Sequence, residues 1–202
     1  MTKIKFCGLS RAEDIATANE IKPDYVGFVF ATKSKRYVTP EKARALRQLL
    51  DAGIKAVGVF ADEKPERAAE LLNSGVIDMA QLHGGEDEAY IAQLRSLTDK
   101  PVMQAFQITC REDVAKAENS SADLILLDSG AGTGRAFDWE LIGQVSRPYF
   151  LAGGLDCHNV AFAVRELRPC GVDASSGIER DGIKDKSKMA AFAAAVRKED
   201  EK

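Results

Sequence analysis

The chain has 202 residues, of which 45% are hydrophobic and 29% charged, and its formal net charge is -3. That length supports one substantial hydrophobic core and is short for two domains. No block of basic residues is interleaved with aromatic ones, which argues against a nucleic-acid partner.

Strand-like and helix-like stretches alternate along the chain. Short apolar runs predict strands at 3–7, 25–30, 54–60, 77–81, 102–106, 124–128, 149–152 and 172–174. Helix-like stretches follow each of them, at 11–21, 40–52, 64–73, 86–97, 111–118, 139–145, 159–167 and 186–196. The second helix is the clearest, because Thr39 stands at its N-cap and Pro40 at its first position.

The rhythm of these elements predicts the fold class. Strands that alternate with helices imply a parallel sheet, and Val, Ile, Leu and Phe dominate them as in buried parallel strands. Eight repeats without a linker favour closure, so we expect one α/β domain over 1–202, a single (β/α)8 TIM barrel with short loops. The charged residues 198–202 are expected to be a frayed tail.

Cysteines and histidines give little sign of a metal or a disulfide framework. The four cysteines are Cys7, Cys110, Cys157 and Cys170, without any CxxC spacing, and His83 and His158 lie far apart in sequence. We therefore expect no metal and no cofactor. The N-terminus does not resemble a signal peptide and no apolar run reaches membrane-spanning length, so a cytoplasmic protein with reduced thiols and no membrane partner is expected.

Two glycine-centred segments, 150–155 and 171–179, end the seventh and eighth predicted strands. Backbone N–H groups exposed at such turns bind anions, and these two loops form the phosphate site of many barrels. The alternative is that Gly153, Gly154 and Gly177 only permit tight turns or close packing. Because two such loops occur together, the pattern favours phosphate binding, with the glycine-rich stretch 130–134 as a further donor or cover.

Cys7 and Asp128 end the first and sixth predicted strands, on opposite sides of a closed barrel. A lone cysteine there is more often a small buried hydrophobe, and an aspartate is often a turn residue. Together they suit an acid and a base acting on one small sugar substrate, where one group protonates the ring oxygen and the other removes the proton at C2. The thiol must ionise, at least transiently, to act as the base.

Arg36 and His83 also stand at the expected active rim. Arg36 follows the second strand and is able to hold a carboxylate with two parallel hydrogen bonds, although a solvated surface arginine is the simpler interpretation. His83, next to two glycines, is treated as a substrate contact only. The remaining cysteines and His158 are expected to be structural.

At these residues the chain resembles the phosphoribosylanthranilate isomerases of tryptophan biosynthesis, from Lys3 to about Phe192. The matching segments are 5–11, 34–40, 57–60, 81–84, 126–129, 132–134 with 137–139, 151–155, and 171–179 followed by 182–185. The departures are Ala131, where a glycine is usual, and 156–158, where Asp156 is still able to cap the next helix.

The resemblance implies an Amadori rearrangement of N-(5'-phosphoribosyl)anthranilate. Asp128 matches the general acid, Cys7 the general base, and Arg36 the residue that holds the anthranilate carboxylate. The phosphate site that it implies consists of Gly153, Gly154, Ser175, Ser176 and Gly177. It further implies a small phosphorylated substrate without metal or cofactor, in a monomer or homodimer.

Strand alternation adds one prediction that the resemblance does not supply. Lys5 lies on the same face of the first strand as Cys7, so if Cys7 faces the barrel, Lys5 is buried and needs a partner. Asp173, on the strand that neighbours the first on closure, is the expected partner and a second substrate contact. The positive charge of Lys5 would favour the Cys7 thiolate.

Three other functions remain alternatives. The related isomerase of histidine biosynthesis has an aspartate at the first strand, and Cys7 argues against it. A metal-dependent pentose-phosphate epimerase would need inward histidines and carboxylates at several strand ends. A non-enzymatic barrel that only binds a phosphometabolite would need neither Cys7 nor Asp128.

Overall fold

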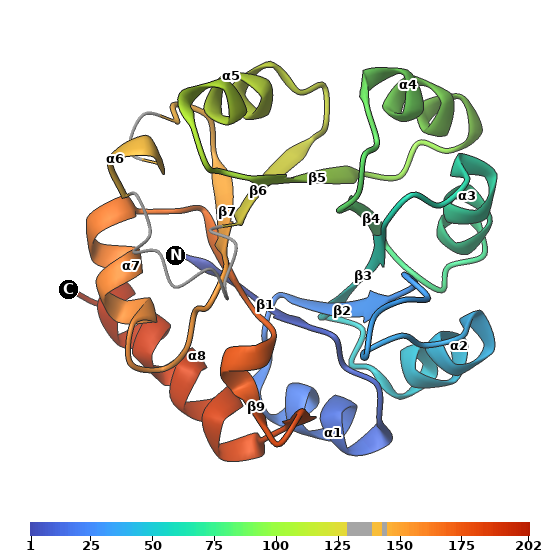
Figure 1. Ribbon diagram of the computed structural model, residues 1–202. Coiled ribbons are helices and arrows are strands. Elements are labelled where there is room, and N and C mark those ends of the chain that lie inside the picture. Colours follow the sequence, from blue (N-terminus) through green and yellow to red (C-terminus); the bar gives the residue numbers. More distant parts are fainter. Residues whose placement is uncertain (129–138, 143–144) are drawn as a thin grey trace.

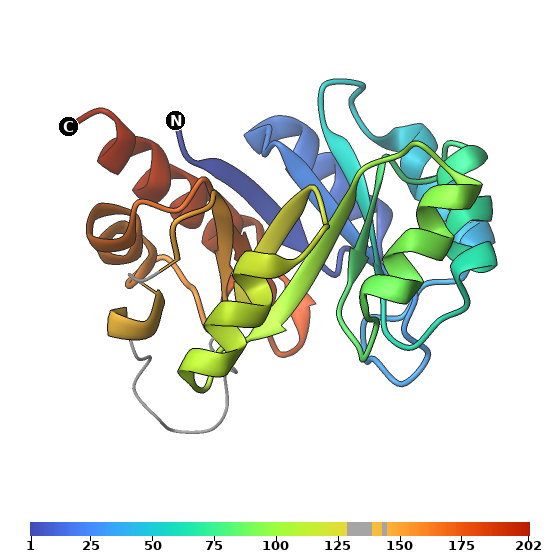
Figure 2. The same ribbon diagram turned by 90° about the horizontal axis from the view of Figure 1, so that it is seen from above.

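The computed structural model describes residues 1–128, 139–142 and 145–202. Within this part of the chain, eight parallel strands form a closed barrel in the order in which they occur in the sequence, and the helices surround it (Figures 1 and 2). The strands are β1 (Lys3–Cys7), β2 (Tyr25–Val29), β3 (Lys55–Phe60), β4 (Met79–Leu82), β5 (Val102–Gln107), β6 (Leu124–Asp128), β7 (Tyr149–Ala152) and β8 (Gly171–Ala174). The predicted closed barrel is confirmed.

The helices alternate with the strands as expected. They are α1 (Ala12–Ile21), α2 (Pro40–Leu49), α3 (Pro65–Asn73), α4 (Glu88–Leu97), α5 (Arg111–Asn119), α6 (Trp139–Ile142), α7 (Val160–Leu167) and α8 (Lys186–Asp200). Thr39 caps α2, because its side chain accepts a hydrogen bond from the Lys42 N–H. The same helix ends at Leu49, earlier than predicted, since Asp51 turns the chain by accepting a hydrogen bond from the Gly53 N–H.

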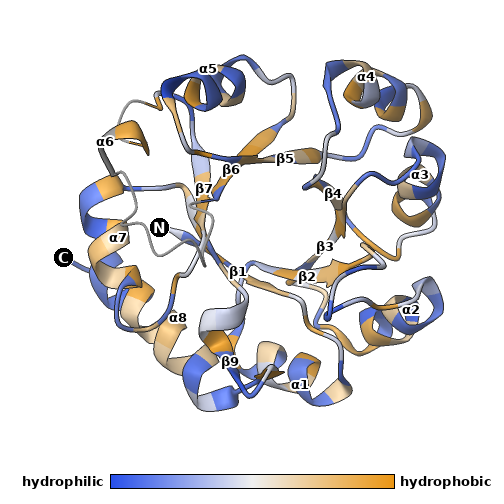
Figure 3. Cartoon of the chain, viewed as in Figure 1, coloured by the Kyte–Doolittle hydropathy of each residue, from blue (hydrophilic) through white to orange (hydrophobic). Residues whose placement is uncertain are grey.

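Two apolar layers hold the barrel together. Between the strands and the helices lies the main core, where large side chains such as Phe6, Phe28 and Phe60 are fully buried. The hydropathy colouring shows apolar residues on the strands and on the inward sides of several helices (Figure 3). Inside the barrel, Val57, Met79, Met103, Leu126 and Phe150 form a second cluster. This filling closes the lower part of the barrel and leaves the C-terminal strand ends for the site.

The barrel closes between β1 and β8, and the register there brings Lys5 opposite Asp173. On the other side of β1, Cys7 pairs with Gly27 of β2. The register therefore positions Cys7 at the upper end of the barrel and the Lys5–Asp173 pair one layer below it.

The C-terminal end differs from the predicted frayed tail. Helix α8 continues to Asp200, whose carboxylate accepts hydrogen bonds from the Thr2 N–H and the Thr2 hydroxyl, both at 2.7 Å. These contacts join the two ends of the chain, which lie at the same end of the barrel in Figure 2. Residues 198–200 are helical because Asp200 has a partner, so only the last two residues lie beyond the helix.

A short segment between β8 and α8 was not predicted. It consists of a 3-10 helix, η1 (Ser176–Ile178), and an antiparallel pair of two-residue strands, β9 (Glu179–Arg180) and β10 (Ile183–Lys184). Among the described residues, no helix combines the length and the apolar character needed to cross a bilayer.

Candidate active site

A cavity of about 580 Å³ opens at the C-terminal ends of the strands. Every predicted site residue lines it: Cys7, Arg36, His83, Asp128, Gly153, Gly154, Asp173, Ser175, Ser176 and Gly177. They come from loops and strand ends far apart in sequence, and only closure of the barrel brings them together. Cys7 and Asp128 lie on β1 and β6, with β7 and β8 between these strands, so the two side chains approach the cavity from different sides.

Cys7 lies above a buried ion pair. Lys5 Nζ is 3.0 Å from Asp173 Oδ1, and the Lys5 side chain has no solvent exposure. The predicted Lys5–Asp173 pair is therefore confirmed. Although burial lowers the pKa of Lys5, the negative charge of Asp173 and contact with Cys7 outweigh it, so the pKa of this ammonium lies above its ordinary value. Lys5 is charged at neutral pH.

The expected effect of Lys5 on Cys7 has the right sign but does not dominate. Burial raises the pKa of the Cys7 thiol, the charge of Lys5 lowers it, and Asp173 raises it again. The balance leaves the pKa of Cys7 above its ordinary value, because the side chain is desolvated at the strand end. At neutral pH the resting group is thus a thiol, and Lys5 limits the cost of ionising it.

Asp128 faces His83, which sequence analysis treated only as a substrate contact. His83 Nε2 is 3.6 Å from Asp128 Oδ2, and the Gln81 amide nitrogen is 3.4 Å from His83 Nδ1. If Gln81 donates to Nδ1, the imidazole carries its proton on Nε2, directed at Asp128. The Gln81 side chain is buried, and its Oε1 has no hydrogen-bond partner among the described residues.

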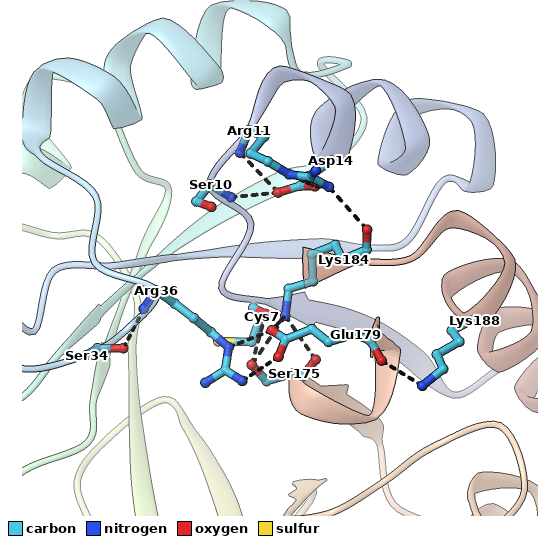
Figure 4. Close-up of polar contacts among 10 residues, drawn as sticks. All are labelled: Cys7, Ser10, Arg11, Asp14, Ser34, Arg36, Ser175, Glu179, Lys184 and Lys188. Atoms are coloured by element: carbon cyan, nitrogen blue, oxygen red, sulfur yellow. Dashed lines mark hydrogen bonds and ion pairs between the residues drawn. The ribbon is translucent and has the colours of Figure 1, made fainter. Parts of the chain in front are cut away.

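Arg36 already binds a carboxylate of the protein (Figure 4). Its Nε and Nη2 donate to the two oxygens of Glu179 at 2.6 and 2.7 Å. Lys184 Nζ donates to the same carboxylate at 2.6 Å and to the Ser175 carbonyl at 2.9 Å. Sequence analysis missed Glu179 and Lys184. Their only signal was that both fall in the matched segments 171–179 and 182–185.

The two glycine loops touch each other. A Cβ atom on Gly177 would lie 2.0 Å from the Leu155 carbonyl oxygen, so only glycine allows the loop after β8 to approach the loop after β7 this closely. The backbone of Gly153 and Gly154 has positive φ, at 95° and 62°. Below these loops, the Ser175 hydroxyl donates to the Cys7 carbonyl at 3.2 Å.

The helices after these loops start close to the positions predicted from the sequence. Helix α7 begins at Val160, and η1 with the β9–β10 hairpin separates β8 from α8. Asp156 does not cap α7 itself but the turn before it, because its Oδ1 accepts from the His158 and Asn159 N–H groups. The loop 130–134, with Ala131, lies outside the described residues. Among the residues that are described, no three His, Cys, Asp or Glu side chains form a potential metal site.

The chain is similar to a set of enzymes of known activity. Residues 4–195 match the family model described as N-(5'phosphoribosyl)anthranilate (PRA) isomerase. A relative of that name from Endomicrobium trichonymphae is 44% identical over 194 residues, which cover 94% of this chain and 95% of the relative. Another from Thermoanaerobacter sp. (strain X514) is 43% identical and covers 98% of both chains.

Solved structures show the same relationship. The phosphoribosyl anthranilate isomerase of Thermotoga maritima superposes with a TM-score of 0.90 at 34% identity, covering 98% of this chain and all of that one. A further isomerase structure, in complex with reduced 1-(O-carboxyphenylamino)-1-deoxyribulose 5-phosphate, superposes with a TM-score of 0.87 at 34% identity over 98% of this chain and all of the other. On this evidence the chain belongs to the N-(5'-phosphoribosyl)anthranilate isomerase family.

Proposed function

We propose that the protein converts N-(5'-phosphoribosyl)anthranilate to 1-(2-carboxyphenylamino)-1-deoxyribulose 5-phosphate with Asp128 as general acid and Cys7 as general base. The observation that carries this assignment is that both side chains line one cavity from separate strands. The glycine-containing loops after β7 and β8, of the kind that binds anions, line the same cavity. Such an arrangement allows the two groups to act on different atoms of one bound sugar.

The first step opens the sugar ring. Asp128 gives a proton to the ring oxygen, the bond between C1 and that oxygen breaks, and the lone pair of the anthranilate nitrogen forms a C=N bond. His83 Nε2 lies 3.6 Å from Asp128 Oδ2, and a small approach of this nitrogen, when protonated, would stabilise the carboxylate left behind. The product of this step is a protonated Schiff base, which makes the proton at C2 acidic.

The second step removes that proton. Cys7 takes it from C2, and the electron pair of the C–H bond forms the C1=C2 bond of the enolamine while the C=N pair returns to the nitrogen. The enolamine becomes the ketone when C1 gains a proton and the hydroxyl on C2 loses its proton to solvent. The reaction needs Asp128 with a proton and Cys7 without one. Because burial raises the pKa of Cys7, the protein with Cys7 as a thiolate is a minor form. The charge of Lys5 below the sulfur increases the fraction of that form.

Two groups of contacts hold the substrate in this proposal. The loops after β7 and β8, with Gly153, Gly154 and 175–177, bind the phosphate through backbone N–H groups. Arg36, which follows β2 and bonds Glu179 just beyond the β8 loop, binds the anthranilate carboxylate with the part of its guanidinium that faces the cavity. Asp173 is a further proposed substrate contact.

The proposal requires a compartment in which Cys7 stays reduced. All four cysteines are free, and a thiol base is lost on oxidation, so we place the protein in the cytoplasm. We further propose that it is a monomer or homodimer. The direct test of the reaction generates the fluorescent substrate in situ and follows its fluorescence after protein is added. We expect a loss of fluorescence at a rate proportional to the protein concentration. No loss above the rate without protein would contradict the proposal.

A further inference from the structure

Only part of the Arg36 guanidinium is free to bind a ligand. The edge formed by Nε and Nη2 is engaged by Glu179, whereas Nη1 has no partner among the described residues. The aliphatic part of Arg36 lies over Gly8, where a Cβ atom would come within 2.4 Å of Arg36 Cδ. The side chain is therefore clamped at both ends, although it is 31% exposed and lines the cavity.

Glu179 is itself fixed from below. Lys184 reaches it from the neighbouring strand of the β9–β10 hairpin and also bonds the end of β8 through the Ser175 carbonyl (Figure 4). Lys188 donates to the Glu179 carbonyl at 2.6 Å, which ties the hairpin to α8. Glu179 and Lys184 are both buried and neither lines the cavity. A bound substrate in the cavity would thus touch Arg36 but not Glu179.

The cluster combines two cationic groups, Arg36 and Lys184, with one carboxylate, Glu179. Burial lowers the pKa of Lys184 below its ordinary value although the hydrogen bond to Glu179 opposes it, whereas the hydrogen bond to Glu179 raises the pKa of Arg36. Burial alone would raise the pKa of Glu179, but the hydrogen bonds from Arg36 and Lys184 outweigh it and lower that pKa below its ordinary value. The carboxylate is ionised at neutral pH, so the cluster is ready for one more anion at the rim.

We propose that Glu179, held by Lys184, is a positioning residue that presents the free end of Arg36 to the cavity and so makes the site select a carboxylate-bearing aryl group. This rests on the proposed role of Arg36. Without Glu179 the guanidinium would have to be ordered by the substrate itself, at a cost in binding free energy. A sugar phosphate without that carboxylate would gain no binding free energy from the contact between Glu179 and Arg36.

The test compares two ligands by calorimetry. The first is the reduced product analogue, reduced 1-(2-carboxyphenylamino)-1-deoxyribulose 5-phosphate, and the second is the same compound without the carboxyl group. For Glu179→Gln we expect binding of the first to weaken by about tenfold and binding of the second to change by less than about twofold. Turnover should show KM raised more than kcat is lowered. Glu179→Asp, which keeps the charge but is too short to reach both nitrogens, should be intermediate.

A double-variant comparison separates positioning from a structural role. In an Arg36→Met background, Glu179→Gln should have no further effect on either ligand, because the group that it positions is gone. The matched control is Glu70→Gln, which removes a carboxylate that pairs with Arg67 on the exposed surface of α3 and should leave binding unchanged.

Three outcomes would overturn the inference. Equal weakening of both ligands by Glu179→Gln, or an effect that persists without Arg36, would mean that Glu179 only supports the hairpin. Tighter binding of the first ligand would mean that Glu179 competes with the substrate carboxylate. Failure of the underlying proposal is distinguishable, because Arg36→Met alone would then weaken both ligands equally.

Discussion

Lys5 Nζ and Asp173 Oδ1 lie 3.0 Å apart across the β1–β8 seam of the barrel, directly below the Cys7 thiol. The pair keeps the buried Lys5 ammonium next to Cys7, which becomes negative in the proposed mechanism. Lys5 lies two residues before Cys7 on the same strand, so the inward face of β1 supplies both the proposed base and its counter-ion.

Removing the positive charge should change the pH profile of the reaction. Lys5 lowers the pKa of Cys7, so Lys5→Met should raise that pKa further. In the proposed mechanism the active form has one proton on Asp128 and none on Cys7. The plateau value of kcat/KM should therefore fall by about tenfold for each unit by which the pKa of Cys7 rises. At high pH kcat/KM declines, because Cys7 ionises when Asp128 has already lost its proton. This decline should move to higher pH as the pKa of Cys7 rises. A profile measured with Lys3→Met, which alters an exposed pair on the same strand, should be unchanged.

Breaking the pair from the other side should affect stability. Asp173→Asn leaves Lys5 buried without its counter-ion, and we expect a loss of about 3 kcal/mol in the free energy of unfolding, measured with urea. Lys3→Met, which breaks the exposed Lys3–Asp24 pair, should cost less than about 1 kcal/mol. Equal effects of the two variants would show that burial of the Lys5–Asp173 pair is energetically unimportant.

Gln81 should act on catalysis through His83. Gln81→Leu removes the donor that faces His83 Nδ1 and frees the ring to adopt the other tautomer. We expect kcat to fall by about tenfold, as it should for His83→Asn, and the double variant to be no worse than His83→Asn alone. Nitrogen NMR of the imidazole should report protonation at Nε2 in the unaltered protein. Protonation at Nδ1, or additive losses of kcat, would contradict this role.

Gly177 should be intolerant of any side chain. In Gly177→Ala the new Cβ meets the Leu155 carbonyl and forces the two loops apart, so affinity for the reduced product analogue should fall by about tenfold or more. Gly85→Ala is the control, because a Cβ there makes only an ordinary contact at 3.4 Å with the Asp62 side chain. Calorimetry on both variants checks the prediction, and unchanged affinity in Gly177→Ala would show that loop contact does not shape the phosphate site.

The sequence was sufficient for the barrel because its elements carry strong local signals. Eight apolar runs alternating with helical stretches predict eight strands and their order, and closure then makes β1 and β8 neighbours. The Lys5–Asp173 pair followed from strand alternation and this closure alone. The end of α8 was missed because the contact between Asp200 and Thr2 joins opposite ends of the chain.

The features of the site that depend on tertiary contacts could not be predicted from the sequence. The β9–β10 hairpin consists of two-residue strands, too short to show any periodicity, so its delivery of Glu179 and Lys184 to Arg36 had no local signal. The direction in which the pKa of Cys7 shifts was also not predictable from the sequence. It depends on how completely the strand end is desolvated, and that is a property of the closed barrel.

The central claim is that Asp128 and Cys7 carry the proton transfers. Its most direct test measures turnover of the fluorescent substrate by Asp128→Asn and Cys7→Ala together with their affinity for the reduced product analogue. We expect kcat to fall by roughly 10³-fold in each variant, while the dissociation constant changes by less than about threefold. Turnover near that of the unaltered protein in either variant would contradict the assignment.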